Sequence, residues 1–298
     1  MFFPSAILPQ KFLTTIGLSS FLTLGVGLGL GSTTQASFAQ QASTYGLGMP
    51  GSASTGGATR GTICATIATL TTNPSNTSPT KCMDSFPRII LLSPEDGSRT
   101  SVSRPTFYWY VTGSSGEDSQ QFKVTFVLRD GATEEASPIY RTELVTDRPG
   151  LYRFTLPSEV ELKPGQPQRW QIRWQSASGS NTANANAAVM WQAKDPQISQ
   201  QLAGMNNLEK ARWYKQNGYW YDAVAAYTLW LEQDNPKDTT ARSERTEILN
   251  AGLATQVNLT KDAKQQPDPA KLEYFLQKLN DTAFANDLPA ASTNELVP

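Results

Sequence analysis

Carboxylates are the residues of this sequence best suited to chemistry, because its 298 residues include no histidine. Serine and cysteine nucleophiles usually rely on a histidine base, and histidine is the commonest metal-binding side chain. Only two cysteines are present, which argues against a structural zinc site. The composition therefore predicts no catalytic residue, no metal and no cofactor, and among common enzyme classes it leaves only a carboxylate-based hydrolase open.

Two acidic pairs are the candidates for such a hydrolase, since glycosidases need two carboxyl groups that face a substrate. Glu134 and Glu135 are adjacent, so strand alternation would send them to opposite faces. Glu159 and Glu161 lie just before the Pro-Gly turn at 164–165. Because charged side chains are mostly exposed, we expect all four on the surface, and we expect the protein not to be an enzyme.

Residues 1–39 have the pattern of a signal peptide. Lys11 supplies the positive charge, the stretch 12–30 is apolar or small, and Ser37 and Ala39 place small residues before a cleavage site that precedes Gln40. An uncleaved anchor is the alternative, since the apolar stretch is nearly long enough to span a bilayer. Both readings predict an exported protein, located in the periplasm, the outer envelope or the extracellular medium.

Cys64 and Cys82 are the only possible disulfide pair. Export places them in an oxidising compartment, where a disulfide across this loop would contribute about 3 kcal/mol in the chain-entropy model. The alternative is a pair of free thiols. Both cysteines lie in residues 40–85, a Gly-, Ser- and Thr-rich segment expected to be a flexible lead-in.

The charge balance argues against nucleic-acid binding. The net charge of the chain is −1, whereas phosphate binding requires a basic surface. No basic cluster suggests adhesion to an anionic membrane, so we expect membrane contact only through the signal segment if that segment is not cleaved.

Residues 86–194 show a hydrophobic period of two, which is typical of strands. In the stretch 106–111, Phe107, Trp109 and Val111 share one face, and Tyr108 and Tyr110 share the other. The same alternation recurs at 122–129, 152–156 and 169–174; residues 88–92 form a short apolar run, and 139–144 and 188–193 are weaker strand candidates. About seven short strands separated by turn signals predict an antiparallel, immunoglobulin-like β-sandwich.

Residues 195–262 change to a helical period and predict a small all-α domain. Asp195 and Pro196 suit a helix start, and Asn206 with Glu209 forms a capping-box pattern. We expect helices over 196–204, 206–217, a third segment ending before Pro236, and 240–253. Residues 263–298 predict a linker, a short amphipathic helix over 269–280, and a disordered tail.

Two resemblances follow from the motifs. The spacing of Tyr214, Gly218, Trp220, Ala223 and Tyr227 is similar to that of one tetratricopeptide-type helix pair. Over residues 60–238, the chain resembles a family of cyanobacterial exported proteins, domain of unknown function 928. The stretches that carry this resemblance are Arg60-Gly61 with Cys64, residues 105–111, residues 149–170, and residues 208–236. The resemblance implies export and an envelope setting, but no reaction.

Aromatic side chains suggest two kinds of binding surface. Trp213, Tyr214, Tyr221 and Trp230 are more than one helix pair can bury, so we expect a partner surface there, because aromatics are enriched at interface hot spots. Tyr108 and Tyr110 are expected to face outward, where they would suit a carbohydrate. The leading hypothesis is a non-enzymatic, exported envelope protein that binds an unknown envelope protein. The alternative is a carbohydrate-binding sandwich with a polysaccharide partner.

Overall fold

The structure is a computed structural model that describes residues 45–49, 89–112, 122–146, 150–175, 182–260, 266–281 and 286–287. All of them belong to the second of two units, Met1–Gln40 and Gln41–Pro298, into which the chain divides. The expected signal segment, and the expected pairing of Cys64 with Cys82, lie outside the described residues.

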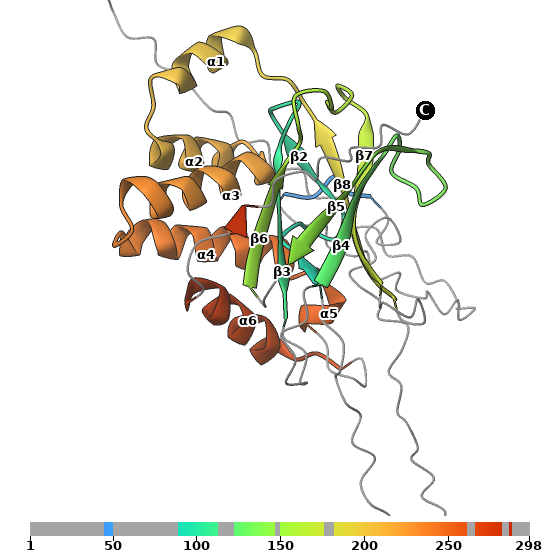
Figure 1. Ribbon diagram of the computed structural model, residues 1–298. Coiled ribbons are helices and arrows are strands. Elements are labelled where there is room, and N and C mark those ends of the chain that lie inside the picture. Colours follow the sequence, from blue (N-terminus) through green and yellow to red (C-terminus); the bar gives the residue numbers. More distant parts are fainter. Residues whose placement is uncertain are drawn as a thin grey trace, which may run out of the picture. The chain divides into compact units, whose positions relative to one another are not determined.

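The described strands form two sheets (Figure 1). One sheet has the order β1-β3-β6-β9 and the other the order β2-β8-β7-β4-β5. Their bounds are β1 Ile89–Leu91, β2 Ser98–Thr100, β3 Thr106–Val111, β4 Phe122–Arg129, β5 Pro138–Thr146, β6 Gly150–Thr155, β7 Pro167–Gln175, β8 Thr182–Trp191 and β9 Asn286–Asp287.

Most strand pairs are antiparallel, as predicted, but the sheets are mixed. β2 runs parallel to β8, with Ser98 opposite Val189, and β9 runs parallel to β6. Both exceptions involve strands of two or three residues, which are too short to show a hydrophobic period. The expectation of purely antiparallel sheets is therefore corrected.

Aromatic side chains from both sheets pack against one another. Phe107 of β3 lies 4.7 Å from Trp170 of β7 and 5.2 Å from Phe126 of β4, measured between ring centroids. Phe154 of β6 lies 4.8 Å from Phe126. All four side chains are at most 2 % exposed. This agrees with the hydrophobic period of two, which predicted that they lie on the inward faces of their strands. Each such ring pair adds about 0.5–1.5 kcal/mol beyond the burial of apolar area.

The helices follow β8 in sequence and precede β9. Their bounds are α1 Pro196–Ala203, α2 Asn207–Gln216, α3 Trp220–Leu229, η2 Trp230–Asp234, α4 Thr239–Leu253, α5 Val257–Thr260 and α6 Pro269–Asp281. Asp195 caps α1, and Asn206 and Glu209 form the predicted capping box of α2. A π-helical turn, η2, continues α3 and was not anticipated. Asp238 then caps α4 by accepting a hydrogen bond from the Ala241 amide.

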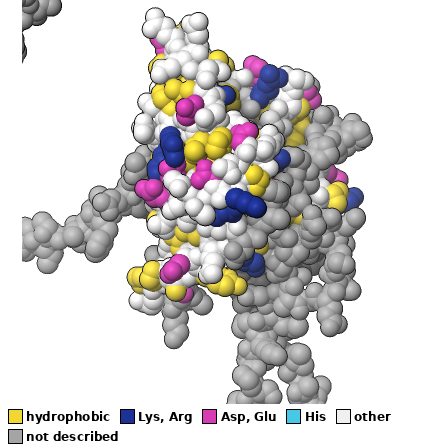
Figure 2. Space-filling view, turned by 90° about the vertical axis from the view of Figure 1, so that its left-hand side faces the viewer, with side chains coloured by type: hydrophobic (Ala, Val, Ile, Leu, Met, Phe, Trp, Pro, Cys, Tyr) yellow, Lys and Arg dark blue, Asp and Glu magenta, His cyan; other side chains and the backbone are white. Residues whose placement is uncertain are grey.

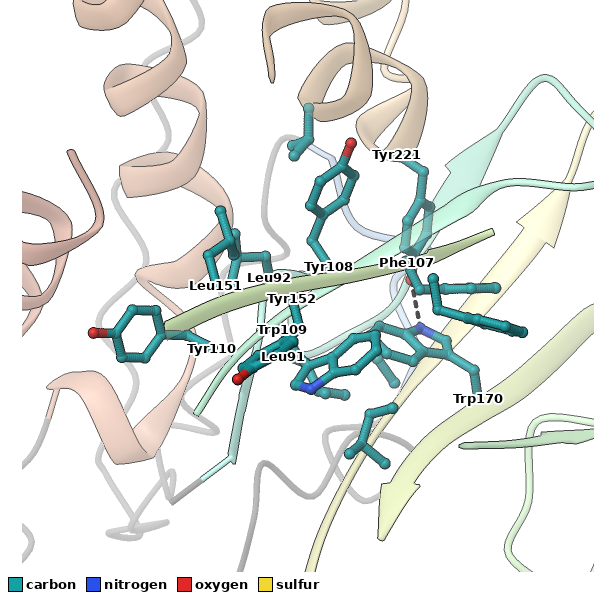
Figure 3. Close-up of a cluster of buried hydrophobic side chains, with 14 of the residues drawn as sticks. Leu91, Leu92, Phe107, Tyr108, Trp109, Tyr110, Leu151, Tyr152, Trp170 and Tyr221 are labelled. Carbon is teal, nitrogen blue, oxygen red and sulfur yellow. Dashed lines mark hydrogen bonds between the residues drawn. The ribbon is translucent and has the colours of Figure 1, made fainter. Parts of the chain in front are cut away.

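The helices cover the second face of the β1-β3-β6 sheet. The Tyr110 ring meets Phe275 of α6 edge-on at 5.5 Å, and Arg153 of β6 forms a partly buried ion pair with Glu232 of η2. In Figure 3, Tyr108 and Tyr110 lie on one side of β3, while Trp109 lies on the other. This sheet is therefore sandwiched between the other sheet and the helices.

Trp220 of α3 joins the helices to the sheets. It is fully buried, and its indole Nε1 donates a hydrogen bond to the Leu92 carbonyl over 3.0 Å. A Cβ added at Gly252 of α4 would lie 2.1 Å from the Trp220 ring, so α4 can approach α3 this closely only with glycine at position 252.

Candidate binding surface

Three half-buried aromatic side chains meet at the turn between α2 and α3. The Trp213 ring lies 5.6 Å from Tyr214 and 5.9 Å from Tyr219, and Tyr214 lies 6.2 Å from Tyr219. Gly218, with φ of 74°, makes the turn, and the Tyr219 amide then donates to the Tyr214 carbonyl. We call Trp213, Tyr214 and Tyr219 the aromatic surface.

Two basic side chains flank the aromatic surface. Lys194, in the segment between β8 and α1, places its Nζ 5.0 Å from the centre of the Tyr214 ring and donates to the Tyr214 hydroxyl over 3.1 Å. Arg99 of β2 lies against Gly218, where an added Cβ would meet its Nη2 at 3.0 Å. Its Nε is buried and has no hydrogen-bond partner among the described residues. The surface therefore combines apolar rings with positive charge.

A buried carboxylate anchors α3 to the sheet beneath this surface. Asp222 accepts hydrogen bonds from the backbone amide of Ser101, over 2.9 Å, and from the Ser101 hydroxyl. Lys194 donates to the same hydroxyl over 2.6 Å. Burial raises the pKa of Asp222, and the Ser101 hydrogen bonds and Lys194 only partly oppose this.

A serine hydroxyl bonded to a lysine amine resembles the nucleophile of enzymes that use lysine as the base. Ser101 is only 6 % exposed, and its hydroxyl is already held by both Lys194 and Asp222. A nucleophile has to reach its substrate. The arrangement therefore fits an anchor between α3 and the sheet better than a catalytic site.

The raised pKa of Asp222 predicts a pH effect on stability. A carboxyl whose pKa is higher in the folded state stabilises the fold below its unfolded value of 3.8, and this contribution is lost as the pH rises through the folded pKa. We expect the stability advantage of the natural protein over Asp222→Asn to shrink as the pH rises from about 4 towards neutrality. Urea denaturation at a series of pH values measures this difference in the free energy of unfolding between the two proteins.

Asp238→Asn is the matched control for this experiment. Hydrogen bonding to the Ala241 amide lowers the pKa of Asp238, so its contribution disappears only as the pH falls below 3.8. Asparagine also serves as a helix cap. Its difference from the natural protein should stay constant above about pH 4. Parallel pH curves for the natural protein and Asp222→Asn would contradict the burial argument.

The structure separates the residues expected to form the partner surface. Trp213 and Tyr214 are half-buried and lie together. Trp230 is half-buried as well, and its Nε1 donates to Asp238 over 2.9 Å. Tyr221 is 2 % exposed, so its expected place on the surface is wrong. Its hydroxyl bonds Ser93 inside the molecule, and it also accepts a hydrogen bond from Trp170 (Figure 3).

The expected exposure of Tyr108 and Tyr110 is also wrong. Each is 3 % exposed, because the helices cover the face of β3 on which both lie. Burial raises the pKa of Tyr108 to about 12, against the lowering effect of Arg153. Neither ring is available to stack on a sugar, so the carbohydrate surface proposed at these residues is withdrawn.

Sequence reasoning missed Arg99, Lys194 and Tyr219. The first two lie outside the helical segment in which we expected the surface, and only folding brings them to it. Tyr219 could have been identified from the sequence. It directly follows the turn glycine, and it adds one more large ring to a helix pair that already has more aromatic side chains than it can bury.

The acidic pairs are exposed, as expected. Glu134, Glu135, Glu159 and Glu161 all have exposed side chains, and Glu134 forms an ion pair with Arg169 over 3.5 Å. Within the described ranges, no three acidic, cysteine or histidine residues lie close enough to hold a metal ion. Nor is any helix of the described part long and apolar enough to cross a membrane.

The fold and the site define the class of this protein as a β-sheet protein with an attached helical region. It has two contacting β-sheets, a helical layer over one of them, and an aromatic surface at a helix turn. Residues 55–267 match the family model Domain of Unknown Function (DUF928), so the chain belongs to this family, as its motifs indicated. No match was found among curated proteins or among solved structures.

Proposed function

We propose that this chain is an exported, non-enzymatic protein of the cell envelope, and that it binds another protein through the aromatic surface. The carrying observation is the cluster of Trp213, Tyr214 and Tyr219, three half-buried rings in mutual contact beside two cations. Aromatic side chains that keep some exposure while packed together are typical of interface hot spots. Export rests on the pattern of residues 1–39.

In this proposal the two sheets are an immunoglobulin-like sandwich, and α2 and α3 are a tetratricopeptide-like helix pair. The contacts of Phe107, on one sheet, with Phe126 and Trp170 on the other support the sandwich. A lone helix pair lacks the neighbouring repeats that would cover it, and here the sheets cover one side of the pair. The aromatic surface is at the end of the pair where its two helices are joined.

The flanking cations favour a partner that presents carboxylates. Lys194 and Arg99 both lie at the aromatic surface, and Arg99 forms no ion pair within the described part of the chain. Elsewhere on the helical side, charges of both signs are interspersed with hydrophobic side chains (Figure 2). This mixture supports a local protein contact and argues against nucleic acid as the partner.

We expect Trp213→Ala and Tyr219→Ala each to weaken partner binding at least about tenfold, because truncating a hot-spot aromatic typically costs about 2 kcal/mol or more. An affinity pull-down from envelope extract, followed by mass spectrometry, identifies the partner, and titration of the purified partner gives the dissociation constants. Arg99→Gln should weaken binding less at high salt than at low salt.

Tyr274→Ala is the matched control, since Tyr274 is 67 % exposed on α6 and takes no part in the aromatic surface. Circular dichroism establishes that each variant is folded. If the folded Trp213→Ala and Tyr219→Ala variants bind the purified partner as tightly as the natural protein, the interface lies elsewhere and the proposal fails.

A further inference from the structure

A polar groove lies between two helices on a different part of the molecule. It has a volume of about 830 Å³ and runs between α4 and α6. Among the described residues that line it, all except Pro269 and Leu276 are polar. They include Ser243, Thr246 and Asn250 on α4, and Glu273, Gln277 and Asn280 on α6. We call this the α4–α6 groove.

The spacing of these residues explains why the groove stays open. Positions 243, 246 and 250 recur at helical spacing on α4, and 273, 277 and 280 do so on α6, so each helix presents a polar stripe. Helices that pack closely usually meet along apolar stripes. Here the buried side chains of Leu272, Phe275, Leu276 and Leu279 form an apolar stripe on α6 next to the polar one, and Phe275 contacts Tyr110.

One end of the groove is fixed by hydrogen bonds. The Asn280 side chain donates to the Thr246 hydroxyl over 2.8 Å, and Arg242 donates to the Asn280 carbonyl over 3.2 Å. These bonds hold α6 against α4 before any ligand arrives. A preformed site avoids the entropic cost of ordering its own groups on binding.

Most of the remaining polar groups are available to a ligand. Ser243, Asn250, Glu273 and Gln277 make no side-chain hydrogen bond within the described part of the chain. They offer a hydroxyl, two amides and a carboxylate, which together donate and accept hydrogen bonds. The described lining includes Glu247 and Glu273 but no lysine or arginine, and the Arg242 side chain at the end of the groove is bonded to Asn280, so the charge of the lining disfavours an anionic ligand.

We propose that the α4–α6 groove binds a neutral oligosaccharide segment, and this inference goes beyond the proposed protein partner. Sugar hydroxyls both donate and accept hydrogen bonds, which matches the lining. The volume falls within the usual range of ligand sites, roughly 300–1,000 Å³. Tyr274 directly follows Glu273 and is 67 % exposed, so α6 also carries an exposed ring beside the polar stripe.

A peptide fits this groove less well than a sugar. Peptide sites depend on apolar anchors or on strand edges, and the described apolar residues that line this groove are Pro269 and Leu276, of which Leu276 is 6 % exposed.

A hydrolytic activity also fits this groove less well than sugar binding. Glu247 also lines the groove, but its side chain is 70 % exposed and ion-paired with Lys215, unlike the buried carboxyl of a general acid.

The test uses the mature chain and an array of neutral oligosaccharides of hexoses and N-acetylhexosamines, with oligogalacturonate as the anionic probe. We expect binding to at least one neutral oligosaccharide with a dissociation constant of about 1 mM or tighter, and no binding to oligogalacturonate. Gln277→Ala and Asn250→Ala should each weaken this binding about tenfold. Backbone amide shifts in nuclear magnetic resonance spectra should change along α4 and α6.

Trp213→Ala, which removes a ring of the aromatic surface, is the matched control and should leave oligosaccharide binding unchanged. Failure of the protein-partner proposal would therefore leave this result intact, and the reverse also holds. The absence of binding to every neutral oligosaccharide, preferential binding of oligogalacturonate, or binding that folded Gln277→Ala and Asn250→Ala variants retain in full would overturn the proposal.

Discussion

Replacing Trp220 by alanine is expected to destabilise the folded protein by about 3–5 kcal/mol. The side chain is fully buried, its ring contacts Tyr45 at 5.3 Å, and its Nε1 donates to the Leu92 carbonyl. Truncation removes apolar contacts, leaves a cavity and deprives a buried carbonyl of its donor. Urea denaturation measures the loss.

The same experiment tests whether sheets and helices unfold together. Since Trp220 contacts both, we expect the far-ultraviolet circular dichroism and the tryptophan fluorescence to shift together in one transition. Trp220→Phe keeps an aromatic ring but loses the indole N–H donor, so it should lower the free energy of unfolding by only about 1–3 kcal/mol. This variant replaces Trp220→Ala in the experiment if the alanine variant does not fold. An unchanged midpoint in the Phe variant, or separate transitions for the two signals, would contradict the role assigned to Trp220.

The second large effect is expected at Trp170, in the centre of the contact between the two sheets. Trp170→Ala should cost about 3–5 kcal/mol as well. The ring is fully buried, lies 4.7 Å from Phe107 and donates to the Tyr221 hydroxyl over 2.8 Å. The loss should therefore affect both the sheet contact and the attachment of α3, and the melting temperature should fall.

Trp230→Ala is the control for Trp170→Ala, because it makes the same chemical change at a half-buried side chain. A double-mutant cycle with Trp170→Phe and Tyr221→Phe isolates the hydrogen bond, for which we expect a coupling energy of about 0.5–3 kcal/mol. If Trp170→Ala folds with an unchanged melting temperature, the placement of Trp170 between the sheets is wrong.

The elements of this fold could be predicted because their signals are local. Alternation placed Phe107, Trp109 and Trp170 on buried strand faces, and all are buried. Caps at Asp195 and Asn206 marked helix starts, and Gly218 marked a helix turn. The motifs that carried the family resemblance are short stretches of the same kind, and the family match agrees with them.

The candidate sites depended on which elements pack together, and no local pattern contains that information. Alternation correctly placed Tyr108 and Tyr110 opposite Phe107, but it could not show that helices far along the chain would cover that face. Tyr221 was assigned to the surface for the same reason, although it reaches the core.

The amino-acid sequence by itself thus determined most of the strands and helices, the caps at Asp195 and Asn206, and the family of this protein, because hydrophobic period, capping and turn formation act between residues a few positions apart. Only the tertiary structure decided which aromatic side chains remain exposed, that Arg99 and Lys194 flank the aromatic surface, and that a polar groove runs between α4 and α6. Burial and charge at those places come from residues distant in sequence, and their contacts exist only once the helices have packed on the sheet.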